Sequence, residues 1–132
     1  MNNLISHRTD LALFLVRFAV GASFISHGIM HLGDFGTTIS LFSILGLSPL
    51  WAQIVTILEI ICGVFFVAGV FVEWVAIILT MIMLVAVILI SIIKGDSSFF
   101  ELNLILLFCS LAIAFGGSGG YSITRFFPRR SL

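Results

Sequence analysis

The sequence predicts an all-α integral membrane protein, an antiparallel bundle of four transmembrane helices with a short interfacial helix between the first two spans. Hydrophobic residues make up 61% of the 132 residues and charged residues only 9%, whereas roughly a quarter of the residues in a soluble domain are charged. The mean hydropathy of +1.30 agrees with this composition. A spanning helix needs about 20 mainly apolar residues, and the segments that approach or exceed this length are 11–30, 50–72, 74–93 and 99–115.

The first apolar segment carries polar residues that are unusual in a membrane span. Arg17 lies in its interior, and His27 and His31 lie at its far end. At about 100° per residue, Arg17 shares one helix face with Gly21 and Gly28. Glycines on a polar face let a neighbouring helix approach closely. We therefore expect this face to be turned toward the other helices.

The stretch between the first two spans predicts a turn and a short helix. The glycines and the aspartate of residues 33–36 are typical of a turn. Residues 37–45 are largely apolar, which favours a short helix that lies flat in the membrane interface. Ser48 and Pro49 then fit the N-cap and first position of the second span.

The last two spans follow with short links. Segment 74–93 contains no charged residue, and segment 99–115 is short and has Glu101 in its first turn, so its start is expected at the interface. Short links between consecutive helices make them antiparallel neighbours. A glycine-rich break over 116–120 precedes a basic tail over 121–132.

The distribution of basic residues predicts the orientation in the membrane. Four spans put both termini on one side, which carries Arg8, Arg125, Arg129 and Arg130, whereas the other side carries Lys94. The positive-inside rule then places both termini in the cytoplasm. The formal net charge of zero leaves no basic surface for nucleic acid.

Two ionisable residues are expected deep in the bilayer, Arg17 and Glu59. Glu59 shares a helix face with Thr56 and Gly63 on the second span. In antiparallel helices the two charges lie at depths that differ by about 10 Å. Because intramembrane charges usually face the bundle interior and mark functional paths, they predict a polar pocket for a small ligand or a proton. A structural ion pair that fixes the helix register stays open as the alternative.

Further polar and sulfur-bearing residues along the chain are candidate ligands. His27, His31 and Glu101 are expected to gather toward the outer leaflet. The two histidines are four residues apart and could share a metal, but no third ligand has motif spacing, so we expect hydrogen-bonding groups and no metal site. Cys62 and Cys109 lie inside apolar runs, and we interpret each as a small buried apolar residue. A redox role for the pair stays open.

Motifs along the chain carry a family resemblance. They are Leu15-Val16-Arg17-Phe18-Ala19-Val20-Gly21, His27-Gly28, Gly46-Leu47-Ser48-Pro49, Leu58-Glu59-Ile60-Ile61-Cys62-Gly63, Phe100-Glu101-Leu102-Asn103 and Gly119-Gly120-Tyr121-Ser122-Ile123. Together they resemble the DoxX family of small four-helix bacterial membrane proteins, over nearly the whole chain.

The resemblance implies a single transmembrane domain over 1–132 in the inner membrane of a bacterium. It implies a redox-associated subunit, linked to quinones or thiols, with a polar site lined by Arg17, His27, Glu59 and Glu101. A quinone headgroup would sit among the first three of these, with Glu59 relaying protons, and no covalently bound cofactor is expected.

The same resemblance bears on partners. Electrons would come from another subunit, so we do not expect a complete enzyme in this chain alone. Membrane lipid, and either other membrane subunits or further copies of the chain, are the expected partners. The alternatives are a non-enzymatic scaffold or assembly subunit and a small protein that binds or transports a lipid or solute.

Overall fold

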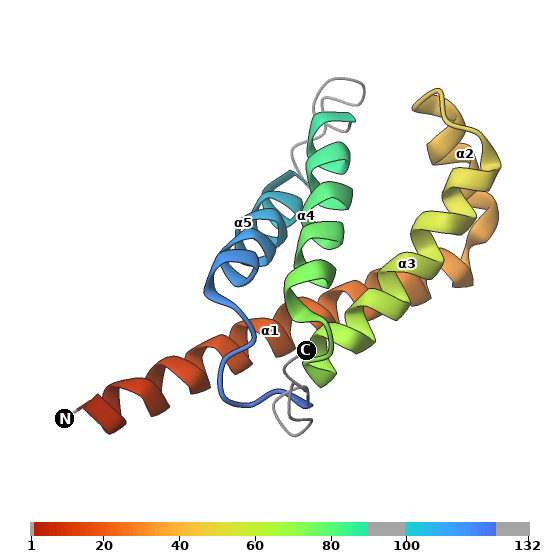
Figure 1. Ribbon diagram of the computed structural model, residues 1–132. Helices are drawn as coiled ribbons and strands as arrows, with labels where there is room; N and C mark the ends of the chain where they lie inside the picture. The colour runs from red at the N-terminus through yellow and green to blue at the C-terminus, as the bar shows by residue number, and fades with distance from the viewer. Residues whose placement is uncertain (1, 90–99, 124–132) are drawn as a thin grey trace, which may run out of the picture.

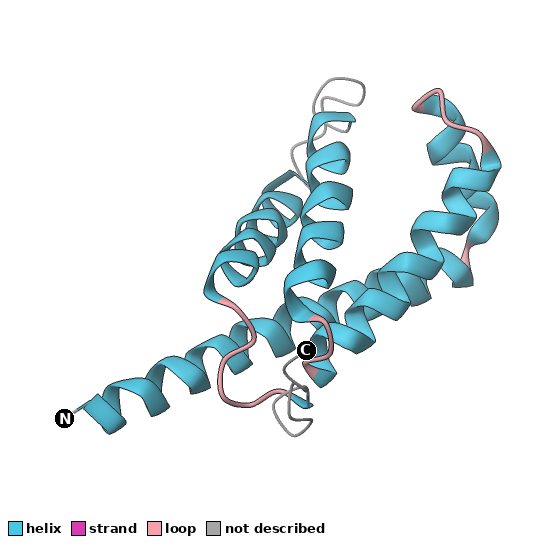
Figure 2. Cartoon of the chain, viewed as in Figure 1, coloured by secondary structure: helices cyan, strands magenta, loops and turns pink. Residues whose placement is uncertain are grey.

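The computed structural model describes residues 2–89 and 100–123, and every regular element in these two ranges is an α-helix (Figure 2). The helices are α1 (Asn2–Gly33), α2 (Phe35–Ile44), α3 (Pro49–Ala68), α4 (Val72–Leu89) and α5 (Phe100–Gly116). The all-α class predicted from composition is therefore confirmed. The predicted end of the third span and the link around Lys94 lie outside the described residues, as do Arg125, Arg129 and Arg130 of the basic tail.

The four longer helices form two antiparallel pairs. Helix α1 packs mainly on α3, and α4 packs mainly on α5. The turn between α3 and α4 joins the pairs, which diverge from there, while α2 lies beside the opposite end of α3 (Figure 1). The first turns of α1 project past the other helices. The short α3–α4 link therefore connects two pairs, and the closest partner of α3 is α1.

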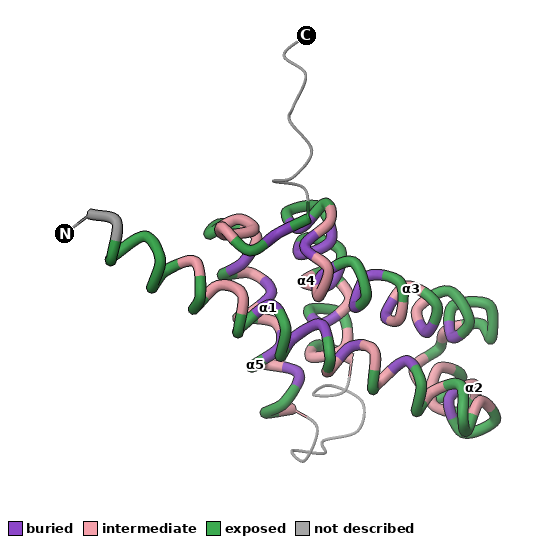
Figure 3. Tube along the Cα trace, turned by 90° about the horizontal axis from the view of Figure 1, so that it is seen from below, coloured by how far each residue is buried: buried purple, intermediate pink, exposed green. Residues whose placement is uncertain are grey.

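Length and composition make this a multi-pass membrane protein. In the described ranges, the helices long and apolar enough to span a membrane are Leu4–Gly33, Pro49–Ala68 and Val72–Leu89. Helix α5 is a shorter apolar helix of 17 residues, at the lower limit of the length that crosses a bilayer. Every helix has exposed positions (Figure 3). Many of the exposed side chains are large and apolar, such as Trp74 and Phe115, and they suit contact with lipid.

The short helix α2 confirms the helix predicted between the first two spans. Its N-cap is Asp34, whose side chain accepts a hydrogen bond from the backbone N–H of Thr37 at 3.2 Å. The Thr37 side chain first, and this backbone bond second, hold the pKa of the exposed Asp34 carboxyl below its ordinary value. Helix α1 runs from Asn2 to Gly33, longer than the predicted 11–30, because no glycine or proline interrupts its polar first turns.

Helix α3 begins as expected and ends earlier than the predicted residue 72. Ser48 is its N-cap and Pro49 its first residue. It ends at Ala68, because Gly69 adopts a left-handed conformation with φ of 75° and closes the helix. The N–H of Val70 then bonds to the carbonyl of Phe65 at 2.9 Å.

Close backbone contact between α1 and α3 depends on glycine. A Cβ built on Gly63 would lie 2.8 Å from the Gly21 carbonyl oxygen and 3.0 Å from the Ile25 nitrogen. A Cβ built on Gly21 would lie 2.8 Å from the Gly63 carbonyl oxygen. Backbone atoms cannot move aside as a flexible side chain can. The two glycines therefore set the distance between these helices, as small residues do in membrane interfaces.

Gly63→Ala is expected to lower the unfolding free energy by about 2 kcal/mol, since overpacking against a fixed backbone costs about 1–3 kcal/mol. Thermal unfolding of the purified protein in detergent measures this. Gly36→Ala is the matched control, because a Cβ at Gly36 meets nothing within 4 Å, and it should leave stability unchanged or slightly raised. Equal stability of both variants would contradict the close contact.

Candidate functional site

Arg17 is buried in a cradle at the end of the chain that the structure describes. Its side chain is 1% exposed and reaches from α1 to the loop after α5. One terminal nitrogen donates to the carbonyl oxygen of Ser118, and the other donates to that of Tyr121. The guanidinium carbon lies 5.7 Å from the ring centre of Phe14, within cation–π range. Arg17 is thus held mainly by backbone carbonyls.

A second contact from α1 holds the same loop. The Asp10 carboxylate accepts a hydrogen bond from the Gly120 N–H at 2.6 Å. The loop can lie this close because Gly119 is left-handed, with φ of 67°, and a Cβ there would come within 3.2 Å of Leu13. Asp10 and Arg17 therefore fasten the loop over 117–122 to α1.

The surroundings of Arg17 also favour its charge. A Cβ built on Gly69 would lie 3.0 Å from the Arg17 Nη2 atom, so the guanidinium lies against the C-terminus of α3. The loop carbonyls that it binds follow the C-terminus of α5. Both helix ends carry partial negative charge. This arrangement makes Arg17 a cross-brace between α1, α3 and the loop.

A separate ionisable pair lies toward the other end of α1. His31 Nδ1 and Glu59 Oε2 are 3.1 Å apart, with side-chain exposures of 30% and 3%. Neither of these two atoms makes an aligned hydrogen bond within the described residues, so the pair is a close contact between ionisable groups. The pair can share one proton, either as neutral histidine with a carboxylic acid or as an ion pair.

His27 belongs to the same cluster. It precedes His31 by one helical turn, and the two ring centres are 6.3 Å apart in an edge-on arrangement. Its side chain is half-buried. We name His27, His31 and Glu59 the α1–α3 acid–base cluster. Two imidazoles and one carboxylate can accept and pass on protons across this helix contact.

The structure divides the four residues that the resemblance assigned to one site. Arg17 and His31 are both on α1 and fourteen residues apart (31 − 17), which corresponds to about 21 Å along the helix axis. Because Glu59 contacts His31, Arg17 and Glu59 lie in different surroundings. Glu101 is exposed in the first turn of α5. His27 and Glu59 remain together, and His31 joins them.

His31 is absent from the four predicted site residues, although the sequence indicates that it lies close to them. His31 follows His27 by four residues and lies on the face of Arg17 and Gly28. Its partner could not be read from this spacing, because the register between α1 and α3 decides which residue meets it. The predicted inward face of α3 is buried in the structure: it comprises Thr56, Glu59, Gly63 and Phe66.

Metal and thiol chemistry find little support in the described residues. In the ranges 2–89 and 100–123, no three histidine, cysteine, aspartate or glutamate side chains gather in a way that could hold a metal ion. Cys62 and Cys109 are free thiols, the first buried and the second half-buried. The acid–base cluster therefore has the clearest chemistry in the described part of the chain.

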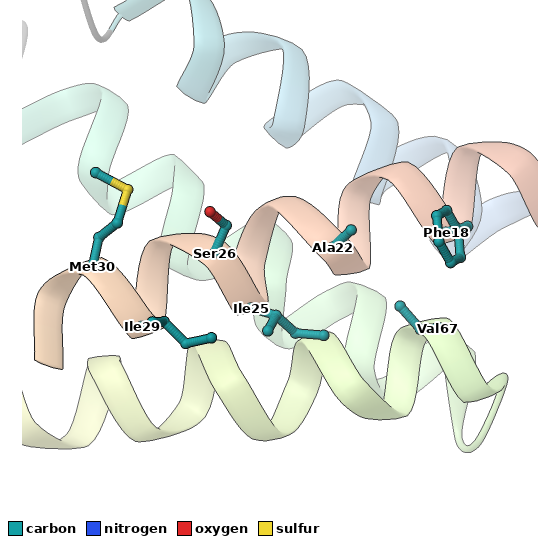
Figure 4. Close-up of a pocket in the computed structure, with 7 residues that line it drawn as sticks. All are labelled: Phe18, Ala22, Ile25, Ser26, Ile29, Met30 and Val67. Atoms are coloured by element: carbon teal, nitrogen blue, oxygen red, sulfur yellow. The ribbon is translucent and has the colours of Figure 1, made fainter. Parts of the chain in front are cut away.

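Two hollows lie along the α1–α3 pair. The larger, about 420 Å³, is an open apolar groove on the outer side of α1 (Figure 4), lined by Phe18, Ala22, Ile25, Ser26, Ile29, Met30 and Val67. The smaller, about 240 Å³, lies where α1, α2 and α3 meet, lined by Leu32, Phe35, Gln53, Thr56 and Ile57. The groove suits a lipid chain. His27, His31 and Glu59 are not among the residues that line these two hollows.

Comparison with known proteins gave one match. The model of the DoxX family matches residues 12–92, more than half of the chain. The matched region contains Arg17 and the acid–base cluster, and it ends before Glu101. No curated protein and no solved structure matched the chain.

Proposed function

Because the chain belongs to the DoxX family, we propose that it is a redox-associated membrane subunit that binds a quinone headgroup at the α1–α3 acid–base cluster. The observation that supports this most is the 3.1 Å contact between His31 and the buried Glu59. An ionisable pair inside a membrane protein is costly to bury, and such groups commonly mark proton or ligand paths.

The cluster fits a quinone headgroup. Quinone oxygens accept hydrogen bonds, and quinol hydroxyls donate them. His31 and His27 offer ring nitrogens that can donate or accept, and the Glu59 carboxylate can accept. The 30% exposure of His31 leaves its side chain open to an incoming group. A bound quinone would supply two-electron, two-proton redox chemistry.

The protein groups have distinct roles in this proposal. His31 binds the headgroup oxygen, and Glu59 holds the imidazole and exchanges a proton with it. His27 offers a second ring along α1 through which a proton can pass. The electrons come from a partner protein that carries a redox centre. Arg17 acts in the fold, through its loop contacts.

We also propose in which membrane the protein lies and how its termini are oriented there. The chain is placed in the inner membrane of a bacterium, with both termini in the cytoplasm. The basic residues counted in the sequence support this, as does the packing of α5 against α1: a Cβ at Gly116 would lie 3.2 Å from Leu13. The end of α5 thus lies beside the first half of α1.

Glu59→Gln is expected to weaken quinone binding by about tenfold or more, because Glu59 holds the imidazole that donates to the quinone oxygen and interactions with charged groups are worth about 1.5–3 kcal/mol. The measurement is equilibrium binding of a radiolabelled short-chain benzoquinone to the purified protein in lipid nanodiscs. Glu73→Gln is the matched control, since Glu73 is exposed in the first turn of α4.

Glu101→Gln distinguishes the proposed site, His27, His31 and Glu59, from the site implied by the family resemblance, which includes Glu101. Glu101 is exposed on α5, so this variant should bind the quinone as the wild type does. Loss of binding in Glu101→Gln with normal binding in Glu59→Gln would contradict the proposed site.

A scaffold without enzymatic activity is the second candidate, and the Arg17 cradle favours it. Three regions, α1, the end of α3 and the loop after α5, meet at one guanidinium. A protein that serves as a rigid membrane partner benefits from such a cross-brace. For this candidate, wild-type protein should bind no quinone, and Glu59→Gln should change only recovery of the folded protein.

A further inference from the structure

The two helix pairs share one hydrophobic core near the α3–α4 turn, and from that turn they diverge (Figure 1). In the described residues, the buried members of this core reach Phe24 and Cys62 on the α1–α3 pair. On the α4–α5 pair they reach Met83 and Leu106. The halves of the two pairs that lie farther from the turn therefore do not share this core.

The acid–base cluster lies on the same helix faces, past the end of the shared core. On α1, His27 and His31 follow Phe24 by three and seven residues, a spacing that keeps them on its face. On α3, Glu59 precedes Cys62 by three residues and shares its buried face. The cluster is therefore turned toward the side from which the α4–α5 pair diverges.

This position leaves ionisable groups without full protein cover. His27 and His31 are half-buried, and 30% of the His31 side chain is exposed. Both lie in a helix long and apolar enough to span the membrane. Ionisable side chains in a span are costly to expose to lipid and normally face the bundle interior. Movement of the α4–α5 pair toward α1 would cover them.

Helix α5 carries a polar residue that matches the cluster in position. Asn103 precedes Leu106 by three residues on the buried face of α5, and it is 6% exposed. A Cβ on Gly116 would lie 3.2 Å from Leu13, which fixes the register of α5 on α1. Asn103 is thirteen residues from Gly116 (116 − 103), and His27 is fourteen residues from Leu13 (27 − 13). These separations correspond to about 20 and 21 Å along two antiparallel helices, so Asn103 and His27 share one level.

The α3–α4 turn has the properties of a pivot. It consists of three residues, 69–71, and both Gly69 and Phe71 are left-handed, with φ of 75° and 48°. This conformation is unfavourable for a bulky residue such as phenylalanine. Domain closure commonly uses a few residues between two elements as its hinge. The Arg17 cradle fastens the loop after α5 to α1 and to the end of α3 at the same level, so movement is expected at the opposite ends of the pairs.

We propose that the α4–α5 pair closes on the α1–α3 pair about residues 69–71, and that the Asn103 amide then hydrogen-bonds to an imidazole nitrogen of His27. Asn103 thereby becomes a positioning residue of the acid–base cluster, because a bond to one ring nitrogen decides which nitrogen carries the proton. The closed arrangement covers the cluster with protein in place of lipid. This inference goes beyond the proposed function, since it holds whatever ligand the cluster binds.

A pair of cysteines tests the closure. His27→Cys with Asn103→Cys, in a chain with Cys62→Ala and Cys109→Ala, is oxidised in membranes with copper phenanthroline and analysed by non-reducing electrophoresis. A disulfide requires Cα atoms within about 7 Å, so a bridge within one chain is expected. Ser26→Cys with Asn103→Cys is the matched control, because Ser26 lines the outer groove of α1 (Figure 4). This control should bridge at least about tenfold less.

Asn103→Leu tests the bond to His27, because leucine has a similar size and lacks the amide. Carbethoxylation of His27 in nanodiscs, followed by mass spectrometry, should become about fivefold faster, as for the loss of one hydrogen bond. The exposed His7 is the internal standard, and its rate should not change. Ser110→Ala is the matched variant: Ser110 is buried on the same face of α5, closer to the turn, so His27 should react less than about twofold faster.

The remaining outcomes contradict the inference in distinct ways. Equal bridging of the two cysteine pairs, or no bridge in either, would show that α5 does not close on His27. A bridge between two chains would show that a second copy covers the cluster. An unchanged His27 rate in Asn103→Leu, or an equal rise in Ser110→Ala, would remove the role of Asn103. Failure of quinone binding would leave all of these results unaffected, because no quinone is used in them.

Discussion

Arg17→Gln is expected to release the loop over 117–122 from α1 and to lower the unfolding free energy by about 3 kcal/mol. The guanidinium donates to the carbonyls of Ser118 and Tyr121, and a glutamine side chain is too short to reach both. Hydrogen bonds from a charged donor contribute about 1.5–3 kcal/mol each. Thermal unfolding in detergent measures the stability, and hydrogen exchange at the Gly120 amide measures release of the loop.

Two further variants test whether the loss of stability comes from the contacts between the Arg17 guanidinium and the loop. Arg8→Gln removes an exposed arginine from α1 and should change neither stability nor exchange at Gly120. Arg17→Lys keeps the charge but offers one nitrogen in place of the planar fork, so its stability should fall between those of wild type and Arg17→Gln. Unchanged exchange at Gly120 in Arg17→Gln would show that the cross-brace does not hold the loop.

Much of the burial at these sites was predictable, whereas the partners were not. The 100° periodicity put Arg17 and Glu59 on inward faces, and both are buried. Arg17 binds backbone carbonyls. Because every residue has a backbone carbonyl, the pattern of side chains in the sequence cannot predict which ones Arg17 binds. The glycine-rich segment over 116–120 is predicted as a break, whereas its left-handed residues let it fold onto α1.

The pairing of helices was also beyond the sequence pattern. Apolar length identified the spans, and the short link between α3 and α4 predicts that these two helices are antiparallel neighbours. The structure packs α3 mainly on α1, because Gly21 and Gly63 permit backbone contact there. The register of that contact brings His31 to Glu59 and keeps Arg17 away from both. The buried faces of α1 and α3 could thus be predicted from the sequence. The register between these two helices could not, because it depends on how their side chains and glycines pack together.

His31→Ala is expected to destabilise the protein by about 3 kcal/mol, more than Glu59→Gln does. Without His31, the side chain of Glu59 stays 97% buried and loses the imidazole that lies 3.1 Å from its Oε2 atom. Removing one partner of a buried pair costs about 3–5 kcal/mol, because the remaining charge is uncompensated. Glu59→Gln leaves a partly exposed histidine that can be neutral, so its cost should be about 1 kcal/mol. Thermal unfolding of each variant in detergent gives the comparison.

The double variant His31→Ala with Glu59→Gln completes the test. It should recover most of the stability lost in His31→Ala, since no charge is left buried. His7→Ala with Glu73→Gln, both exposed, should show additive and small effects. Additive losses in the His31–Glu59 cycle would mean that the two side chains do not interact. A double variant as stable as the wild type that binds no quinone would locate the role of the pair in ligand binding, because packing alone would not require two ionisable groups there.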